Sequence, residues 1–378
     1  MNRIEKALIH ALFIHLHHNI DRAIDFEAIK KLNQDVSKRW SRSLIVGPGD
    51  DAAVFRMPGN RGLFVAKQES HCSPCVPKPY DAAATGAGGA MKDVTAMGAR
   101  PMFLLDFVGT RPLDRKVLVG PCGFEEKCTC GKCMEMTSQE RLDLIMKGVR
   151  DMCAAMDVLL VGGGLSTSFS DIVPAVVVAV IGKLVTTKPL TKPAKRAGDK
   201  IILIGETGND GNDTLFRAGL VEEMRPAEAL FTEERTTMEA TLTAFQTGKI
   251  HACSDLGAAG IGAAVCESAR YGGFGARVNL STVPVKVEGL TPEEILICET
   301  QARMVLQVSP KDVDEVMEAI QSKNGLQPTL RPPASGPLAA VIGEITDDDK
   351  EVFEYQGRVV AAIPNKPSEA ILEELKGG

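Results

Sequence analysis

Apolar positions follow two different spacings along the chain, and the two spacings alternate. Short apolar runs bounded by glycine, proline or charge predict strands, whereas apolar residues three or four positions apart predict helices. The runs predict strands at 63–67, 102–109, 158–161, 172–184, 201–204, 276–280, 303–308, 338–345 and 351–363. The helical spacings predict helices at 1–40, 80–97, 138–156, 212–222, 233–247, 257–270 and 310–322. This alternation indicates an α/β or α+β fold with two lobes.

A stretch that contains Pro189, Pro193 and several lysines separates the two lobes and is typical of a linker. A chain of 378 residues is long enough for two domains, since a domain usually holds on the order of 100–200 residues. We therefore expect an N-terminal helical extension, two domains and a short tail. Their expected ranges are 1–40, 41–187, 188–365 and 366–378.

The charge pattern and the apolar runs exclude some classes of function. The net charge is −6 and no basic stripe of the kind found in nucleic-acid binders is visible, so we expect no nucleic-acid partner. No apolar run approaches the roughly 18–20 residues that span a bilayer. The N-terminus lacks the basic-then-apolar pattern of a signal peptide. We expect no membrane association and a cytoplasmic location.

Three acidic segments stand beside glycines at the ends of apolar runs. The first is GPGDDAAVF at 47–55, in which the adjacent carboxylates Asp50 and Asp51 repel each other unless a cation compensates them. Mg²⁺ bound to phosphate oxygens would do so, since magnesium favours carboxylates and phosphates. The third is CSDLGAAGIGAAV at 253–265, where Asp255 precedes a glycine-rich helix start that favours an anion.

The second segment runs from 66 to 101 and carries a reactive set of side chains. Lys67, Glu69 and His71 alternate along a strand, so all three face the same side of the sheet. A small-residue helix follows, with glycine at 86, 88 and 89, and Lys92 and Asp93 stand near its end. Such a helix is disfavoured by propensity and indicates close packing or a ligand beside it. Together the three segments predict a site for nucleotide phosphates and Mg²⁺.

Long motifs then show a resemblance to a known family. The segment at 69–101 reads ESHxxPxxxxPYxAAATGxGGxxxDVxxMGARP, and the second half contains DLGAAGIGAAVCESARYGG, VPVKVEGLTPEEILICETQARM and VIGEITDD. These motifs closely resemble the large subunits of phosphoribosylformylglycinamidine synthase, within the aminoimidazole ribonucleotide synthetase superfamily. The resemblance covers roughly 45–365. It implies a two-lobed fold, with an N-terminal ATP-binding domain whose sheet forms a barrel in a dimer and a C-terminal α/β domain.

The resemblance also implies roles for individual residues. Glu69, Asp93 and Asp255 resemble ligands of Mg²⁺, and His71 resembles the proton acceptor. Lys67 resembles a nucleotide-binding position. The residue pattern itself adds further positions that we expect to bind the cofactor: Asp50, Asp51, Gly86, Gly88 and Gly89. The positions that resemble substrate contacts are Ser70, Lys92, Glu299, Thr300 and Gln301, with Lys92 in place of the usual arginine.

The implied reaction is ATP-dependent. An amide oxygen of the substrate attacks the γ-phosphate of ATP, and ammonia or another nucleophile then displaces phosphate while His71 moves protons. A chain with one copy of the family's repeat is expected to form a homodimer. With no glutaminase-like segment in the chain, a separate glutaminase subunit would supply the ammonia.

Departures from the motif leave other functions open. The expected ESHNHP is ESHCSP here, with Cys72, Ser73 and Cys75 near the reacting centre. The GPGDDAAVF segment resembles sister families: hydrogenase-maturation dehydratase, thiamine-monophosphate kinase and selenophosphate synthetase. A kinase or dehydratase with cysteine-based sulfur or metal chemistry is therefore one alternative, and a non-catalytic metal-binding paralogue is another.

A cysteine-rich insertion at 120–136 interrupts the family pattern. Its cysteines follow the spacing C-x5-C-x-C-x2-C at Cys122, Cys128, Cys130 and Cys133. Four thiolates this close can hold Zn²⁺ or an iron–sulfur cluster. Two other interpretations are an exposed reduced loop with no joint role, and a sulfur relay together with Cys72 and Cys75.

Overall fold

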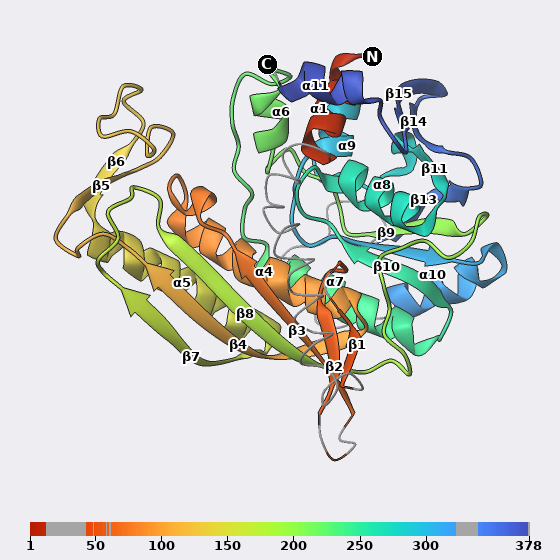
Figure 1. Cartoon of the computed structure of the whole chain (residues 1–378), viewed down its shortest axis with the longest axis horizontal. Coiled ribbons are helices and arrows are strands. Elements are labelled where there is room, and N and C mark those ends of the chain that lie inside the picture. The colour runs from red at the N-terminus through yellow and green to blue at the C-terminus, as the bar shows by residue number, and fades with distance from the viewer. Residues whose placement is uncertain (13–42, 48, 58, 60–61, 323–338, 377–378) are drawn as a thin grey trace.

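The computed structural model describes residues 1–12, 43–47, 49–57, 59, 62–322 and 339–376. It has two lobes, each built on one mixed sheet with helices packed against it (Figure 1). Most of the predicted helix at 1–40 lies outside the described residues; within them, α1 spans Arg3–His10. None of the helices in the described part of the chain is both long and apolar enough to cross a membrane.

The sheet of the first lobe has six strands in the order β1-β2-β3-β8-β4-β7. Their bounds are Leu44–Val46, Ala53–Arg56, Leu63–Ser70, Ala175–Leu184, Ala99–Gly109 and Leu159–Ser166. All neighbours pair antiparallel except β4 and β7, which pair parallel. A hairpin of β5 (Lys116–Val119) and β6 (Met134–Thr137) projects from the outer end of this lobe (Figure 1).

Two long helices, α4 (Pro79–Ala96) and α5 (Ser138–Met156), cover one face of this sheet. The two helices approach closely: a Cβ on Gly148 would lie 2.2 Å from the carbonyl oxygen of Tyr80. The start of α5 is fixed by a capping box, in which the Thr137 hydroxyl accepts from the Glu140 amide and the Glu140 carboxylate accepts from the Thr137 amide.

The opposite face and the β7 edge of the first sheet carry exposed apolar side chains. They are Leu105, Phe107, Leu159, Leu160, Val161 and Leu165. The glycines at 162–164, which the sequence pattern predicts to form a turn, lie within β7 instead. Gly163 pairs with Asp106 of β4, and a Cβ on Gly163 would lie 1.7 Å from Oδ1 of Asp106. The strand therefore excludes a side chain here.

The sheet of the second lobe has seven strands in the order β10-β12-β9-β13-β11-β14-β15. Their bounds are Ile250–Asp255, Met304–Val308, Lys200–Ile204, Ala339–Thr346, Gly275–Asn279, Lys350–Tyr355 and Arg358–Pro364. The single strand predicted at 351–363 is thus a hairpin, which turns at Gly357 with a φ of 75°.

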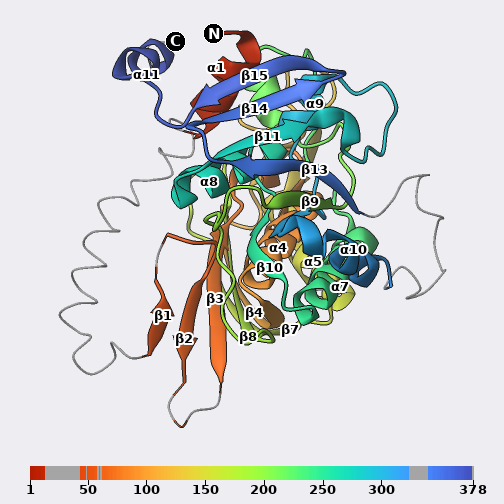
Figure 2. The ribbon, with the colours of Figure 1, turned by 90° about the vertical axis from the view of Figure 1, so that its right-hand side faces the viewer.

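The helices of the second lobe cover both faces of its sheet (Figure 2). They are α6 (Asp213–Arg217), α7 (Phe231–Gln246), α8 (Gly260–Gly272), α9 (Pro292–Ile297), α10 (Val313–Gln321) and α11 (Glu369–Lys376). Short 3₁₀ turns span Ser73–Cys75, Leu280–Thr282 and Pro310–Asp312. The helix predicted at 212–222 is only the five-residue α6.

The two lobes share one continuous core. Ile202 and Ile204 of β9 belong to the same buried cluster as Met238 of α7 and Val94 and Met97 from the first lobe. A second cluster lies on the other face of the second sheet, under α1 and α8. Across the boundary between the lobes, α7 packs against α4 and α5, and α4 also packs against β10. Residues at the ends of α4 and β10 therefore come together between the lobes.

Candidate active site

Three carboxylates from distant segments of the chain meet between the lobes. Asp51 precedes β2, Asp93 stands near the end of α4, and Asp255 is the last residue of β10. Each offers an oxygen, and these oxygens all lie within 4.8 Å of one another. The structure thus brings one residue from each of the three predicted acidic segments into a single cluster.

Burial makes this cluster of negative charge unfavourable without a cation. Burial raises the pKa of Asp51 to about 7, although Lys192 opposes the shift. Burial and the nearby Asp255 also raise the pKa of Asp93 well above its usual range. Oδ2 of Asp51 is buried and has no hydrogen-bond partner in the protein. Three hard oxygen ligands with a buried, unpartnered atom fit Mg²⁺, so Asp51, Asp93 and Asp255 are the residues that would hold it.

Two lysines border the cluster. Nζ of Lys67 lies 2.8 Å from Oδ2 of Asp93 and 3.3 Å from Oε2 of Glu69. Burial alone would lower the pKa of Lys67, but the two carboxylates outweigh it and raise the pKa. Glu69, predicted as a metal ligand, therefore lies beside the three-carboxylate cluster and pairs with Lys67. Lys67, Glu69 and His71 do share one face of the sheet, the face toward α4.

Lys192 is the second lysine, and the sequence analysis did not single it out. Its Nζ lies 2.6 Å from Oδ1 of Asp51 and 2.9 Å from Oε2 of Glu267. Burial alone would lower the pKa of Lys192, but the carboxylates of Asp51 and Glu267 outweigh burial and raise this pKa well above its usual range. Asp50 has a different role from Asp51, because its Oδ1 accepts from the backbone amide of Lys192 at 3.0 Å. Asp50 therefore anchors the linker between the lobes.

His71 lies just beyond β3, against the first turns of α4. Its Nδ1 is 2.6 Å from the carbonyl oxygen of Ala82, so Nδ1 carries the proton and Nε2 is free to accept one. Burial lowers the pKa of His71, and the bond to Ala82 opposes that shift. A Cβ on Gly86 would lie 2.7 Å from Cβ of His71. This helix position must therefore be glycine for the histidine to fit.

The other two glycines predicted to bind a cofactor differ in their surroundings. A Cβ on Gly88 would lie 3.3 Å from Cε of Met152 and 3.4 Å from Oε1 of Glu234, so this glycine faces other helices. Gly89 has no atom within 4 Å of the corresponding position, so it has room beside it. Ser70 is exposed at the end of β3, and its amide donates to Oε1 of Glu69 at 3.3 Å.

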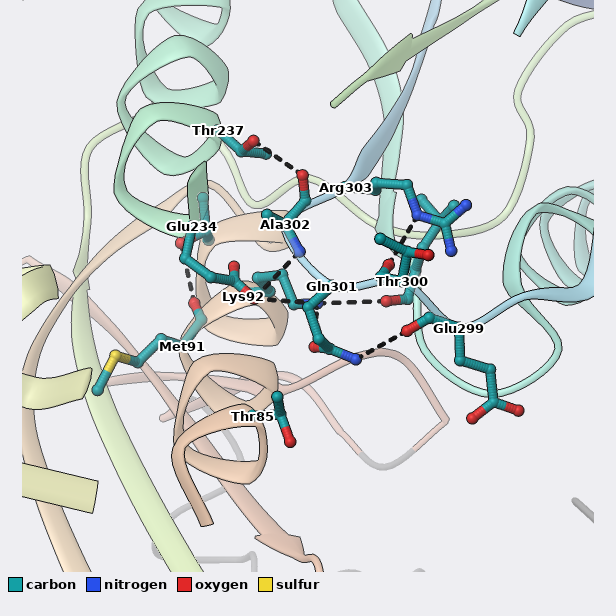
Figure 3. A network of polar contacts seen from close by, with 12 residues as sticks. Thr85, Met91, Lys92, Glu234, Thr237, Glu299, Thr300, Gln301, Ala302 and Arg303 are labelled. Carbon is teal, nitrogen blue, oxygen red and sulfur yellow. Dashed lines mark hydrogen bonds and ion pairs between the residues drawn. The ribbon is translucent and has the colours of Figure 1, made fainter. Parts of the chain in front are cut away.

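Lys92 connects the lobes from within the protein (Figure 3). Its Nζ donates to Oε1 of Gln301 at 2.8 Å and to the carbonyl oxygen of Leu256 at 3.3 Å, and it lies 3.7 Å from Oε1 of Glu234. Glu234, which the sequence analysis did not single out, is buried, and its Oε1 also accepts from the Ala302 amide. Lys92 was predicted to contact the substrate, but its side chain is buried and positions Gln301.

Thr300, also predicted to contact the substrate, is fully buried next to Gln301. Its hydroxyl donates to Oδ1 of Asp210 at 2.8 Å and accepts from the amide of Gly208 at 2.9 Å. Arg303 stabilises the same turn from inside: its guanidinium donates to the carbonyl oxygens of Thr300 and Cys298. These residues therefore fix the turn that carries the neighbouring side chains.

Glu299, Gln301 and His71 all line one cavity of about 310 Å³. Oε1 of Glu299 accepts from the Thr214 hydroxyl at 3.0 Å and from the Ala259 amide at 3.1 Å. Burial nevertheless raises the pKa of Glu299 to about 7. A basic imidazole, an ionisable carboxyl and an amide around one cavity suit the binding of a polar substrate.

Sequence reasoning missed several residues of the same cavity. They include Pro121 and Phe124 from the β5–β6 connection and Asp213, Phe216 and Arg217 from α6. The cysteine spacing at 120–136 indicates a possible metal site but not a cavity wall, and α6 has no pattern that marks it as part of a site. The four cysteines of the insertion, for which joint metal binding was one interpretation, lie together, since their sulfur atoms are all within 4.8 Å of one another.

Comparison with known proteins gives both halves of the chain a family. Residues 49–184 match the family model of the AIR synthase related protein N-terminal domain, and 196–356 match that of its C-terminal domain. The phosphoribosylformylglycinamidine synthase subunit PurL of Methanosarcina mazei is 34% identical over 89% of this chain and 45% of its own length. That of Methanopyrus kandleri is 35% identical over 85% of this chain and 41% of its own. The chain thus spans about half the length of the curated relatives it matches.

Solved structures show the same fold. Thermotoga maritima PurL complexed with FGAR superimposes with a TM-score of 0.67 at 26% identity, over 86% of this chain and 48% of that one. The complex of that protein with ATP gives a TM-score of 0.65 at 26% identity, over 86% and 47%. A HypE–HypF complex gives 0.58 at 18% identity, over 82% and 93%, a likeness of fold.

Proposed function

Because the chain belongs to the AIR synthase related family, we propose that it is an ATP- and Mg²⁺-dependent carbon–nitrogen ligase that resembles phosphoribosylformylglycinamidine synthase. In the proposed reaction, the amide oxygen of formylglycinamide ribonucleotide takes the γ-phosphoryl group of ATP. Ammonia then attacks the activated carbon, and phosphate leaves. The products are the amidine, ADP and phosphate.

The observation that carries this proposal is the cluster of Asp51, Asp93 and Asp255, together with a separate cavity lined by His71, Glu299 and Gln301. Magnesium held there would neutralise the phosphate charge that develops during phosphoryl transfer. Lys67 and Lys192 place two partly buried positive charges next to Asp93 and Asp51 of this cluster. A phosphoryl-transfer site needs mainly positioning and charge neutralisation, and this arrangement supplies both.

The cavity residues would bind and orient the acceptor substrate. Glu299 and Gln301 offer a carboxylate and an amide on one wall, and Lys92 fixes the amide of Gln301 from behind. His71 faces the same cavity as a neutral imidazole whose Nε2 can accept a proton from the attacking ammonia. We propose His71 as the catalytic base, and Glu299 and Gln301 as substrate contacts.

The alternatives that the sequence left open receive no specific support. A sulfur relay needs an ionised thiol near the substrate, but Cys75 is buried, its pKa is raised by burial, and its thiol donates to the His71 carbonyl. The sulfur of Cys72 accepts a hydrogen bond from the backbone amide of Val176. A non-catalytic paralogue would have no need of the buried charges around Asp51 and Asp93. The cysteines at 122–133 lie outside the magnesium cluster, so the metal they would hold is a separate proposal.

We propose two kinds of protein partner. The exposed apolar side chains on β4 and β7 offer a surface for a second copy of this chain, which supports the homodimer. A structure of PurLQS is known from Thermotoga maritima. By analogy, a separate glutaminase subunit would supply ammonia to this chain. The acceptor and ATP are small molecules of the cytoplasm, which we propose as its location.

The test is phosphate release from Mg-ATP by the purified chain. Release that requires both formylglycinamide ribonucleotide and ammonium would support the proposal. Each is omitted in turn as a control. ATP hydrolysis that ignores both additions, or binding of ATP with no release under any of these conditions, would contradict the proposed substrate.

A further inference from the structure

The connection between β5 and β6 holds four cysteines but almost no buried surface. The two strands pair antiparallel, with Val119 opposite Met134, and residues 120–133 join them. Within this connection, only Cys122 and Gly123 are buried. A segment of this length with so little apolar contact needs another source of stability, which in small domains is commonly a metal or a disulfide. All four cysteines are free thiols.

The sulfur atoms are arranged as the ligands of one ion. The Sγ atoms of Cys128 and Cys130 are 3.8 Å apart, as are those of Cys130 and Cys133, and all four lie within 4.8 Å of one another. A tetrahedral zinc site with Zn–S bonds of about 2.3 Å has edges of about 3.8 Å. In an iron–sulfur cluster, the four thiolates are divided among two or four iron atoms, and those on different irons are held further apart.

The backbone supports negatively charged sulfur at this site. The amide of Cys122 donates to Sγ of Cys133 at 3.1 Å, and the amide of Lys132 donates to Sγ of Cys130 at 3.3 Å. Such amide–sulfur bonds orient thiolate ligands around a metal. Gly120 leaves room for the last ligand, since a Cβ there would lie 3.1 Å from Sγ of Cys133.

The same connection forms part of the wall of the candidate substrate cavity. Pro121 and Phe124 line that cavity together with His71 and Glu299. Gly123 packs tightly on the segment that follows β3: a Cβ there would lie 2.6 Å from Cγ1 of Val76. Lys132 and Glu223 form an exposed ion pair at 3.8 Å, which adds little by itself. The position of Phe124 therefore depends on what holds the cysteines.

From these observations we propose that Cys122, Cys128, Cys130 and Cys133 bind one structural Zn²⁺, and that this ion holds Pro121 and Phe124 in place as a wall of the substrate cavity. The zinc has no part in the chemistry, because all four positions around it are filled by protein ligands. Its loss would release the connection at 120–133 and leave the carboxylate cluster between the lobes intact. The assignment of the metal stands independently of the proposed function.

The first experiment measures metal content in the purified full-length chain by mass spectrometry. We expect about one zinc per chain in the wild type and a loss of that zinc in the double variant Cys128→Ser/Cys130→Ser. Cys153→Ala, which alters a buried cysteine of α5, is the matched control and should keep its zinc. Cobalt added to the metal-free protein should give the absorption of a tetrahedral thiolate site. The absence of bound metal, or iron in place of zinc, would overturn the assignment.

The second experiment measures hydrogen exchange with and without the metal. Removal of zinc by a chelator should speed amide exchange at 118–135, and exchange in α4 should stay unchanged. Restoring zinc should restore protection, which separates this effect from unfolding. Equal protection of 118–135 in the two states would overturn the structural role. Neither measurement requires turnover, so both stand even if the proposed reaction fails.

The link to the cavity is tested with Phe124→Ala, which leaves all four cysteines in place. This variant should retain its zinc but bind formylglycinamide ribonucleotide at least about tenfold more weakly, because a lost wall misplaces the substrate. Removal of zinc from the wild type should weaken substrate binding in the same way. The affinity for Mg-ATP should change little in either case. If Phe124→Ala and the zinc-free protein both bind formylglycinamide ribonucleotide as tightly as the wild type does, the connection is not a wall of the substrate site. If the wild type binds Mg-ATP but not formylglycinamide ribonucleotide, the proposed substrate fails, while the zinc result remains.

Discussion

Nζ of Lys92 on α4 lies 2.8 Å from Oε1 of Gln301 in the second lobe and 3.7 Å from the buried carboxylate of Glu234. Replacing Lys92 with Met would leave Glu234 buried without its cation. Breaking a buried pair in this way costs about 3–5 kcal/mol. We therefore expect Lys92→Met to lower the free energy of unfolding by an amount of this order, measured by urea denaturation.

A second substitution separates the charge effect from the loss of packing. In the Lys92→Met background, Glu234→Gln removes the unpaired charge and should recover part of the lost stability. A loss of unfolding free energy below about 1 kcal/mol for Lys92→Met alone would contradict the pairing, since a buried carboxylate without a partner destabilises the fold by more than this.

The three-carboxylate cluster predicts opposite effects of one substitution with and without magnesium. Asp255→Asn removes one of three negative charges that crowd together. In EDTA, the variant should therefore melt higher than the wild type, by roughly 2 °C or more. With Mg²⁺ and ATP present, the wild type should gain stability by mass action, and the variant should gain little.

Melting temperature in EDTA and in Mg-ATP checks this crossover. Asp314→Asn, a change at an exposed position of α10, is the control and should follow the wild type in both conditions. If Asp255→Asn is destabilised in EDTA and still responds fully to Mg-ATP, the cluster is not the magnesium site.

Local sequence pattern predicted the parts of the site that depend on local geometry. The helix at 138–156 matches α5 because Thr137 and Glu140 cap its start. Lys67, Glu69 and His71 share a face because side chains alternate along a strand. The three acidic segments pointed to one site, but the sequence could not choose between Asp50 and Asp51. That choice depends on the Lys192 amide, which binds Asp50.

The parts that were missed depend on contacts between distant segments. Lys192 lies in a linker and Glu234 lies on α7, and no spacing in the sequence relates Lys192 to Asp51 or Glu234 to Lys92. The glycines at 162–164 resembled a turn, but they pair with β4 as part of β7, where Asp106 leaves Gly163 no room for a side chain. Phe124 lines the cavity together with His71 and Glu299, which are distant from it in the sequence.

The exposed apolar face of the first sheet predicts a change of assembly. Phe107→Asp would place a charge on a surface that, in the proposed homodimer, is buried against a second copy. We expect this variant to elute as a monomer, and the wild type as a dimer, in size-exclusion chromatography with light scattering. Tyr271→Asp, at an exposed aromatic residue of α8 in the other lobe, is the control. A wild-type chain that remains a monomer at high concentration would contradict the dimer.

The carboxyl of Glu299 predicts a pH-dependent stability. Burial raises its pKa from 4.5 to about 7, so between these values the folded chain holds a proton that the unfolded chain has released. Stability relative to Glu299→Gln therefore falls as pH rises through this window and is constant above it. The shift corresponds to a loss on the order of 1–3 kcal/mol.

Urea denaturation at pH 5 and pH 8 measures this difference. From pH 5 to pH 8, the free energy of unfolding of Glu299→Gln should rise relative to that of the wild type. The control Glu318→Gln, at an exposed position of α10, should show no such change. Equal differences at both pH values would mean that the carboxyl of Glu299 is not buried as the structure describes.

Two glycines of α4 predict opposite effects of the same substitution. A Cβ on Gly86 would lie 2.7 Å from Cβ of His71, whereas a Cβ on Gly89 would meet no atom within 4 Å. Alanine is favoured over glycine within a helix by about 0.5–1 kcal/mol, so Gly89→Ala should stabilise the fold by that amount. Gly86→Ala should instead destabilise it by about 1–3 kcal/mol because the new methyl group displaces the histidine.

The Gly86→Ala variant should also lose most of the substrate-dependent phosphate release while it still binds Mg-ATP, since His71 moves and the carboxylate cluster does not. Denaturation curves and phosphate release for the two variants decide the matter: equal stabilisation by both would mean that His71 does not pack against Gly86.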